Sequence, residues 1–295
     1  MARRRLGTYL HAKRALLERE LDRILPPMEG RTEKVQSAMR YGVLNGGKRL
    51  RPILTLAVAE IFGVDERQAL VSGCAIELVH CASLILDDLP SMDDAQLRRG
   101  RKACHREFDE STAILASFGL LNRAFQVLQE LKGKGVSQKA IRELTLLLTA
   151  AIGTDGLIGG QIIDLESEKS MDYATLEFIH SHKTIALFLA SAEFGCVLGR
   201  AGGRDRAAIL QYAKPLGLAF QIQDDLLDAL STPEKIGKDV NRDVEKTTFV
   251  SFCGIEGARQ LNRELIQSSI ASLAPFGKRG AILEDIGRFS LSRRS

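Results

Sequence analysis

A chain of 295 residues with 45% apolar residues is long enough to bury one large hydrophobic core. Its 41 basic and 37 acidic residues leave a net charge of +4, a balance that does not favour nucleic acid as a partner. The five cysteines form no CxxC pair, which is typical of reduced thiols in a cytoplasmic protein. We therefore expect one domain over residues 1–295, with any disorder confined to residues 1–5 and 291–295.

The N-terminal segment is basic, but the apolar region of a secretory signal does not follow it. Glu18 and Glu20 arrive instead in an amphipathic helical pattern. An organelle transit peptide over residues 2–14 stays open as an alternative. No window reaches the roughly 18 apolar residues that a membrane span needs, so we expect no membrane-spanning segment.

Helical periodicity fills almost every segment between glycines and prolines, and no alternating run is flanked by hairpin turns. The fold class is therefore predicted to be all-α. The expected helices are 6–25, 33–44, 52–61, 66–89, 111–131, 137–148, a broken 154–168, 172–196, 205–230, 255–273 and 281–291. Three stretches are apolar almost all round, 71–86, 184–198 and 216–227, which predicts that they lie in the middle of a bundle.

Residues 41–52, YGVLNGGKRLRP, contain a near-match to the phosphate-binding P-loop. We reject the P-loop because Arg49 stands where Ser or Thr would hold Mg²⁺, and because the preceding segment is helical. Two glycines, Lys48, Arg51 and a helix opened by Pro52 still predict a cradle for an anion. A solvated basic turn between helices is the alternative.

An acidic stretch closes the next apolar helix at residues 80–94, HCASLILDDLPSMDD. Asp87 and Asp88 fall in the last turn before Pro90, and Asp93 follows in the loop. Carboxylates at a buried helix C-terminus oppose the helix dipole, and a bound cation would offset that cost. Because hard oxygen ligands suit Mg²⁺, the stretch predicts a magnesium site for a phosphorylated substrate.

Basic and imidazole side chains flank this acidic stretch. His80 lies two helical turns before Asp87 on nearly the same face, where it could donate to a phosphate. Arg98 and Arg99 follow in the segment LRRGR and suit bidentate capture of phosphate. The alternatives are a core histidine satisfied by a neighbour and a solvated run of charges.

A second acidic stretch, FQIQDDLLD at residues 220–228, lies far downstream on another apolar helix. Asp224 and Asp228 are four residues apart and share one helical face, which Gln221 and Asp225 flank. Beyond it, a polar segment carrying Lys238 and Lys246 could close over a charged ligand, with a surface loop as the alternative.

Two histidines upstream of this stretch invite a zinc interpretation. His180 and His182 are two residues apart, so on a helix they point about 200° apart and cannot share one metal ion. We expect them to be structural. Lys183 and Thr184 come directly after them at the start of an apolar run and are candidates for the same cavity.

These motifs, in this order and spacing from about Gly46 to Lys246, resemble those of the trans-prenyltransferases, the isoprenyl diphosphate synthases of the polyprenyl synthetase family. The resemblance implies a single-domain isoprenoid-synthase helical bundle around a deep central cavity, usually in a homodimer. It implies Mg²⁺-dependent head-to-tail condensation of isopentenyl diphosphate with an allylic diphosphate.

The resemblance also assigns roles to individual residues. Three Mg²⁺ ions would be bound by Asp87, Asp88, Asp93, Asp224 and Asp228. The allylic diphosphate would be held by Arg98, Lys183, Lys238 and Lys246. Isopentenyl diphosphate would lie against Lys48, Arg51, His80 and Arg99. The catalytic residues would be Lys183, Thr184 and Gln221, and of these Thr184 and Gln221 would turn oxygen dipoles toward the developing allylic cation.

Product length depends, in this family, on a large aromatic residue about five positions before the first acidic motif. This chain has Ala82 there, and the stretch looks most like that of geranylgeranyl diphosphate synthases, so we expect a C20 product. The alternative is C15 farnesyl diphosphate, with Phe118 or Phe125 closing a deeper floor. A non-catalytic partner subunit is less favoured because both acidic motifs are intact, and a terpene cyclase would carry an Asn/Ser/Glu triad in the second.

Overall fold

The computed structural model describes residues 2–167, 171–230 and 247–291. Thirteen α-helices follow one another in these ranges. Their bounds are α1 Ala2–Ile24, α2 Glu33–Leu44, α3 Leu50–Ile61, α4 Glu66–Asp87, α5 Cys104–Glu107, α6 Glu110–Glu130, α7 Gln138–Ile152, α8 Leu157–Glu166, α9 Tyr173–Ile179, α10 Ala186–Leu198, α11 Gly203–Leu230, α12 Phe249–Ala271 and α13 Ala281–Leu291. Short 3₁₀ turns lie at Gly30–Thr32, Leu131–Lys134 and Ala274–Gly280.

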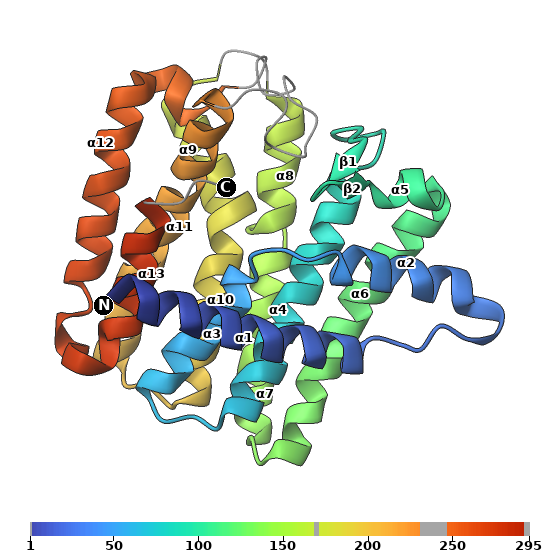
Figure 1. Ribbon diagram of the computed structural model, residues 1–295, viewed down its shortest axis with the longest axis horizontal. Helices are drawn as coiled ribbons and strands as arrows, with labels where there is room; N and C mark the ends of the chain where they lie inside the picture. Colours follow the sequence, from blue (N-terminus) through green and yellow to red (C-terminus); the bar gives the residue numbers. More distant parts are fainter. Residues whose placement is uncertain (1, 168–170, 231–246, 292–295) are drawn as a thin grey trace.

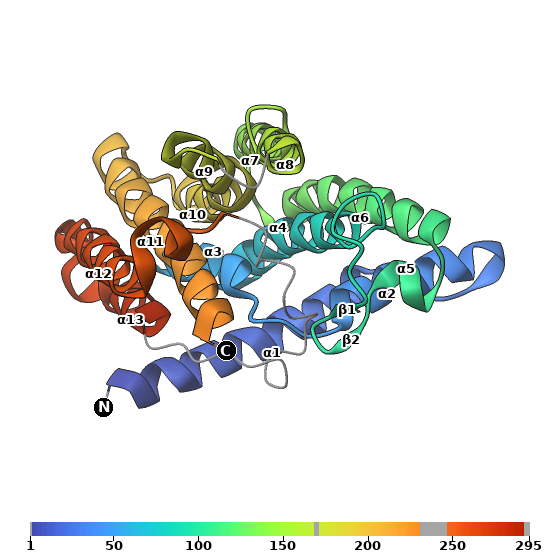
Figure 2. The same cartoon turned by 90° about the horizontal axis from the view of Figure 1, so that it is seen from above.

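The helices form a bundle with α4 and α10 in its interior (Figure 1). Helix α4 packs against α3 and α6, and α10 packs against α3, α7 and α11. Both helices bury residues around most of their circumference, because they are apolar almost all round. Helix α1 lies across one side of the bundle (Figure 2). The predicted all-α class and the central position of the apolar helices are confirmed.

Several helices begin with a polar side chain that caps the free backbone amides. Asp65 accepts from the amide of Arg67 at the start of α4, and Asp109 accepts from that of Thr112 at the start of α6. Thr248 forms a capping box with Ser251 at the start of α12. Such caps typically stabilise a protein by about 1 kcal/mol each, and they set where these helices start.

The structure departs from the predicted elements in two places near the site. A small hairpin, β1 Leu97–Arg98 and β2 Arg101–Lys102, lies where no strand was expected. Strands of two residues are too short to show an alternating pattern, and Arg99 and Gly100 make the turn with positive φ angles of 54° and 76°. The second departure is the predicted helix 172–196, which divides into α9, a π-helical segment His180–Ile185 and α10.

Two helical stretches among the described residues are long and apolar enough, by length and composition alone, to cross a membrane. They are Glu66–Asp87 and Gln138–Glu166. The first is α4, with 78% of the apolar window buried in the bundle, as expected for a core helix. The second combines α7 and α8 and is only 22% buried, so an apolar face of these two helices is exposed.

Candidate active site

A cavity of about 510 Å³ lies where the C-terminal ends of α4 and α11 meet the hairpin and the start of α3. This volume lies within the range that small-molecule sites usually have. Most of the predicted site residues line it: Lys48, Arg51, His80, Asp87, Arg98, Arg99, Lys183, Thr184, Gln221, Asp224 and Asp228. Residues from five separate parts of the chain therefore share one cavity, as the sequence motifs predicted.

Five predicted site residues are not on this wall, three within the described residues and two outside them. Asp88 and Asp93 belong to the same acidic motif but do not line the cavity in this structure. Ala82, the predicted chain-length position, is fully buried, and the Ser117 hydroxyl of α6 donates to its carbonyl at 3.0 Å. Its neighbour Ser83 lines the cavity instead. Lys238 and Lys246 lie outside the described residues.

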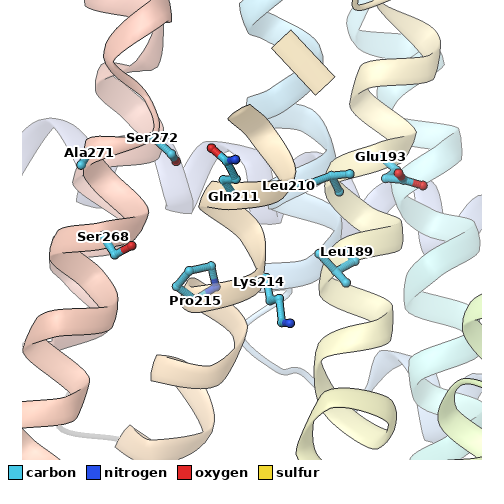
Figure 3. Close-up of a pocket in the computed structure, with 9 residues that line it drawn as sticks. All are labelled: Leu189, Glu193, Leu210, Gln211, Lys214, Pro215, Ser268, Ala271 and Ser272. Atoms are coloured by element: carbon cyan, nitrogen blue, oxygen red, sulfur yellow. The ribbon is translucent and has the colours of Figure 1, made fainter. Parts of the chain in front are cut away.

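A second, wider hollow of about 850 Å³ lies between α10, α11 and α12 (Figure 3). This hollow is lined by Leu189, Lys214 and Pro215, and Ser268 faces it from α12. Neither acidic motif contributes a residue to it. Size alone is therefore a poor guide here, and the smaller cavity carries the reactive groups.

The first acidic motif is folded back onto the end of α4. The amide of Asp93 donates to the carbonyl of Asp87 at 2.9 Å, and the amide of Ala95 donates to that of Asp88 at 3.0 Å. These bonds satisfy carbonyls that a helix end leaves free. The Arg98 guanidinium holds the Asp88 carboxylate through its Nε, at 2.9 and 3.1 Å, and through Nη2. The hairpin thus neutralises Asp88 and leaves Asp87 facing the cavity.

Burial raises the pKa of Asp87 to about 6, and nearby Asp93 adds to the effect while Lys183 opposes it. Burial also raises the pKa of Asp88, although the Arg98 guanidinium beside it acts to lower that pKa. A carboxylate with a raised pKa is destabilised in its charged form, so a cation placed beside it is favoured. The electrostatics of this helix end therefore fit a bound metal ion.

The second acidic motif presents Asp224 and Asp228 to the same cavity from α11. Asp225 points elsewhere: its Oδ1 accepts from Gln221 Nε2 at 2.9 Å, and its Oδ2 accepts from the amide of Phe249 at 3.1 Å. Thr184 Oγ1 lies 3.4 Å from Gln221 Oε1. Asp225 is thus a positioning residue, which holds Gln221 and ties α11 to the start of α12.

Lys183 lies in the π-helical segment between α9 and α10, and its Nζ is 2.6 Å from Asp164 Oδ2 of α8. Helix α8 approaches this segment closely because residue 160 is glycine. A Cβ there would lie 2.9 Å from Lys183 Cα and closer still to its amide nitrogen. Irregular π turns in helices often mark functional sites.

The two histidines beside Lys183 have separate structural partners. His182 stacks on Phe178, with their ring centroids 3.8 Å apart, and its Nδ1 lies 2.7 Å from the Phe178 carbonyl oxygen. His180 stacks on Phe249 at 5.0 Å. The two rings therefore pack against different aromatic residues of the protein.

The basic side of the cavity is built on the turn before α3. Arg51 Nη1 lies 3.4 Å from His80 Nε2, and its guanidinium lies over the Phe188 ring at 4.8 Å. Burial lowers the pKa of Arg51 to about 10 and that of His80 well below its usual value, so His80 is neutral. Arg51 Nε is buried without a hydrogen-bond partner in the described part of the chain. A bound anion would supply this hydrogen-bond partner.

Glycine at position 47 lets the turn and the hairpin meet. Gly47 has a φ of 126°, and a Cβ on it would lie 2.7 Å from the Arg99 guanidinium carbon. Arg99 also donates to the carbonyl of Gly46. Lys48 Nζ lies over the ring of Phe220 at 5.9 Å. The turn, α4 and the hairpin together thus form the basic side of the cavity.

Sequence reasoning missed three residues around the cavity. Arg49 is fully buried, where Glu77 and Glu18 accept its hydrogen bonds at 2.7 and 2.9 Å, and it anchors the basic turn to α4 and α1. Gln161 lines the cavity and Asp164 pairs with Lys183. The signal for the last two was available, because they are the polar residues within an apolar helix that has Glu166 only at its end.

The carboxylates suit Mg²⁺ bound together with a substrate. Among the described residues, no three His, Cys, Asp or Glu side chains come close enough to hold a metal ion by themselves. Mg²⁺ usually takes one or two carboxylates and completes its shell with water and substrate phosphates. Asp87, Asp224 and Asp228 around one cavity fit that mode, and the absence of Cys or His from this set disfavours zinc.

An all-helical bundle that brings two acidic helix ends and a basic turn to one partly apolar cavity defines the class of the isoprenoid synthases. Comparison with known proteins then narrows the class. Residues 32–275 match the family model described as polyprenyl synthetase. The chain belongs to this family, and it is a prenyltransferase.

Individual relatives agree with this assignment. The chain is 39% identical over 292 residues to a dimethylallyltranstransferase of Fischerella ambigua, covering 98% of this chain and 84% of the relative. It is 38% identical over 294 residues to a geranylgeranyl diphosphate synthase of Cyanophora paradoxa, covering 98% and 97%.

Solved structures share the fold. An FPP/GFPP synthase from Zymomonas mobilis matches with a TM-score of 0.89 and 37% identity, over 99% of this chain and 100% of that one. A geranyltransferase from Helicobacter pylori, crystallised with magnesium and isoprenyl diphosphate, matches with a TM-score of 0.84 and 30% identity, over 97% and 96%. The predicted family, fold and enzyme class are confirmed.

Proposed function

We propose that this prenyltransferase condenses isopentenyl diphosphate head-to-tail with allylic diphosphates and releases geranylgeranyl diphosphate as its main product. The observation that carries the proposal is the shared cavity. Acidic groups of α4 and α11 and basic groups of the turn before α3 surround it. Two diphosphates can be held there at once, one through magnesium and one through arginine and lysine.

Asp87, Asp224 and Asp228 would hold Mg²⁺ with the allylic diphosphate, and by family resemblance Asp88 and Asp93 complete a set for three ions. When bound, Mg²⁺ would neutralise negative charge that builds up on the departing diphosphate. Lys183 supplies a further cation from the π-helical segment. The second diphosphate is assigned to Lys48, Arg51 and Arg99 beside His80.

The reaction breaks the allylic carbon–oxygen bond and one carbon–hydrogen bond, and it makes one carbon–carbon bond and one oxygen–hydrogen bond while the double bond shifts. The allylic carbon–oxygen bond breaks, and its electron pair leaves with diphosphate. The double bond of isopentenyl diphosphate then attacks the allylic carbon, and the released diphosphate takes the proton lost from the adduct. Thr184 and Gln221 place oxygen atoms beside the cavity where positive charge develops. The cavity wall includes the apolar side chains of Leu84, Leu187 and Phe220, which limit the access of water to the cation.

The C20 product is supported by small residues at the floor of the cavity. Ser83 lines it, and Ala82 and Ser117 meet directly beside Ser83. Phe118 is 64% exposed, so within one chain it does not close a deeper floor. Farnesyl diphosphate remains the second candidate, because Ala82 itself is off the cavity wall and the Zymomonas mobilis neighbour is named an FPP/GFPP synthase.

We also propose a homodimer located in the cytoplasm. Exposed apolar residues at helical spacing occur on α6, α7 and α8, on the side of the bundle away from α1 (Figure 2). They are Leu115, Phe118, Leu146, Ile158, Ile162 and Leu165. An apolar face of this kind usually marks a protein contact, and a second copy of the chain fits an isologous one. The five unpaired cysteines suit a reducing compartment.

Incubation of the purified protein with labelled isopentenyl diphosphate and each allylic primer tests the proposed reaction. We expect Mg²⁺-dependent C20 product, sized as the alcohol after dephosphorylation. Asp224→Ala should lower kcat by roughly 10²-fold or more, because it removes a metal-organising carboxylate. No product with any primer in the presence of Mg²⁺ would contradict the proposal.

A further inference from the structure

One buried polar group in the cavity has no part in the reaction described above. Gln161 of α8 lines the cavity and is only 9% exposed. Its Oε1 has no hydrogen-bond partner within the described ranges. A buried acceptor without a partner lowers the stability of the fold, so its presence calls for an explanation.

The orientation of the Gln161 amide is defined by the first acidic motif. Its Nε2 lies 3.6 Å from the Sδ of Met92, in the loop between Asp88 and Asp93. Thioether sulfur is an acceptor, so the amide NH₂ group belongs on that side. The carbonyl oxygen is then the atom of this amide that has no partner among the described residues.

Helix α8 is held at both sides of Gln161. Gly160 allows the helix backbone to touch the backbone of Lys183, where a Cβ would collide. Asp164, one turn further along, pairs with the Lys183 ammonium at 2.6 Å. Gln161 therefore sits at a fixed place relative to the segment that carries Lys183 and Thr184. A dipole that is already in place stabilises charge without the cost of reorganisation.

The substrates limit what this oxygen can contact. A diphosphate at neutral pH presents acceptors, which an amide oxygen repels, and the isoprenoid chain presents only hydrocarbon. Positive charge arises on the allylic carbons after the carbon–oxygen bond breaks and its electron pair leaves with diphosphate. A water molecule on Mg²⁺ is the remaining donor that could reach an acceptor in such a site.

We propose that Gln161 is a further catalytic residue, whose side-chain oxygen contacts and stabilises the positively charged allylic carbons alongside Thr184 and Gln221. The inference rests on the proposed condensation. No bond to Gln161 forms: the charge is shared between the two ends of the allyl group until the double bond of isopentenyl diphosphate attacks. Gln161 acts from α8, whereas the other two oxygens come from the π-helical segment and α11.

Gln161→Leu removes the oxygen and keeps the approximate size of the side chain. We expect kcat to fall about tenfold or more with little change in KM, because only the transition state loses a contact. Gln161→Met, a second apolar replacement of similar length, guards against a folding defect in the first. Ile163→Met, on the same helix but not on the cavity wall, is the matched control and should leave kcat within about twofold.

Binding of two inhibitors separates a charge contact from a structural role. One is an isoprenoid diphosphate analogue with a trialkylammonium in place of the allylic cation, and the other is its neutral carbon counterpart. We expect Gln161→Leu to reduce the preference for the charged analogue about tenfold. Equal weakening of both analogues would overturn the proposal. An unchanged preference for the charged analogue, together with a higher Mg²⁺ requirement, would also overturn it, because it would place a metal-bound water at Gln161.

Activity of the wild-type protein separates a failure of the proposed function from a failure of the role of Gln161. Absence of condensation by the wild-type protein would contradict the proposed function. Normal wild-type condensation with an unaltered analogue preference in both Gln161 variants would contradict only the role of Gln161.

Discussion

Asp87 combines a role in metal binding with an energetic cost to the metal-free fold. Its carboxyl is largely buried at the C-terminus of α4, and burial raises its pKa from the ordinary 3.8 to about 6. Between about pH 4 and 6 the folded state then holds more protons at this position than the unfolded state. Folding stability falls as the pH rises through this range and stays lower above it.

Asp87→Asn should therefore stabilise the metal-free protein above pH 6, by roughly 1–3 kcal/mol, while it removes activity. The gain should shrink towards zero below pH 4, where the wild-type carboxyl is protonated in both states. Urea unfolding at pH 4, 5 and 7 in the presence of a chelator measures the difference. A variant less stable than wild type at pH 7 without metal would show that Asp87 is satisfied by the protein itself.

The floor of the cavity gives a prediction about product length. Ser83→Phe should shorten the main product from C20 to C15 or C10, because an aromatic ring would fill space next to Leu84 on the wall. Ala82→Phe should have the same effect through displacement of Ser83, with a larger loss of stability, because Ala82 is fully buried against Ser117.

Product sizing of these variants, with Ser83→Ala as the control that leaves the length unchanged, measures the effect. An unaltered C20 product from both phenylalanine variants would place the floor elsewhere.

At the scale of the element, the contact between α8 and the π-helical segment positions Lys183 and Thr184. The sequence alone predicted one continuous helix there, because an inserted π turn leaves the apolar pattern on either side intact. Packing reveals the reason for the glycine at position 160, since a side chain would strike the Lys183 backbone.

Gly160→Ala should displace this segment and lower kcat by about tenfold or more, since small misplacements of a catalytic group carry large effects on rate. Gly133→Ala is the matched control: a Cβ there meets no atom within 4 Å, so kinetics should not change. Steady-state kinetics and thermal unfolding of both variants test the point. Wild-type kinetics for Gly160→Ala would mean that the segment tolerates movement.

At the scale of the whole molecule, the exposed apolar face of α6, α7 and α8 predicts the assembly. Phe118→Glu should convert the proposed dimer into a monomer, because it places a charge in the middle of a buried contact. Phe118 is 64% exposed in the single chain, so the variant chain should still fold. Met28→Glu alters a residue of similar exposure, 56%, in the connection between α1 and α2, and should leave the mass unchanged.

Sedimentation at micromolar concentration measures the mass of each variant. A monomeric wild-type protein would contradict the proposed dimer. A Phe118→Glu variant that stays dimeric would show that the interface lies on another face.

Much of the fold and of the site was determined by local sequence. Apolar runs defined the central helices, caps and prolines defined where helices start and stop, and spacing alone placed Asp224 and Asp228 on one face of α11. These features depend on residues within a few turns of one another. The acidic motifs could be identified for the same reason, since polar residues in an apolar helix stand out.

Tertiary structure decided which of these groups meet and which do not. Arg98 pairs with Asp88 rather than facing the cavity alone, Asp225 turns to α12, and Ala82 lies behind the wall that Ser83 forms. Arg49 is buried by carboxylates from two other helices. Such pairings join residues far apart in the chain, and their geometry follows from how the helices pack, which local periodicity does not encode.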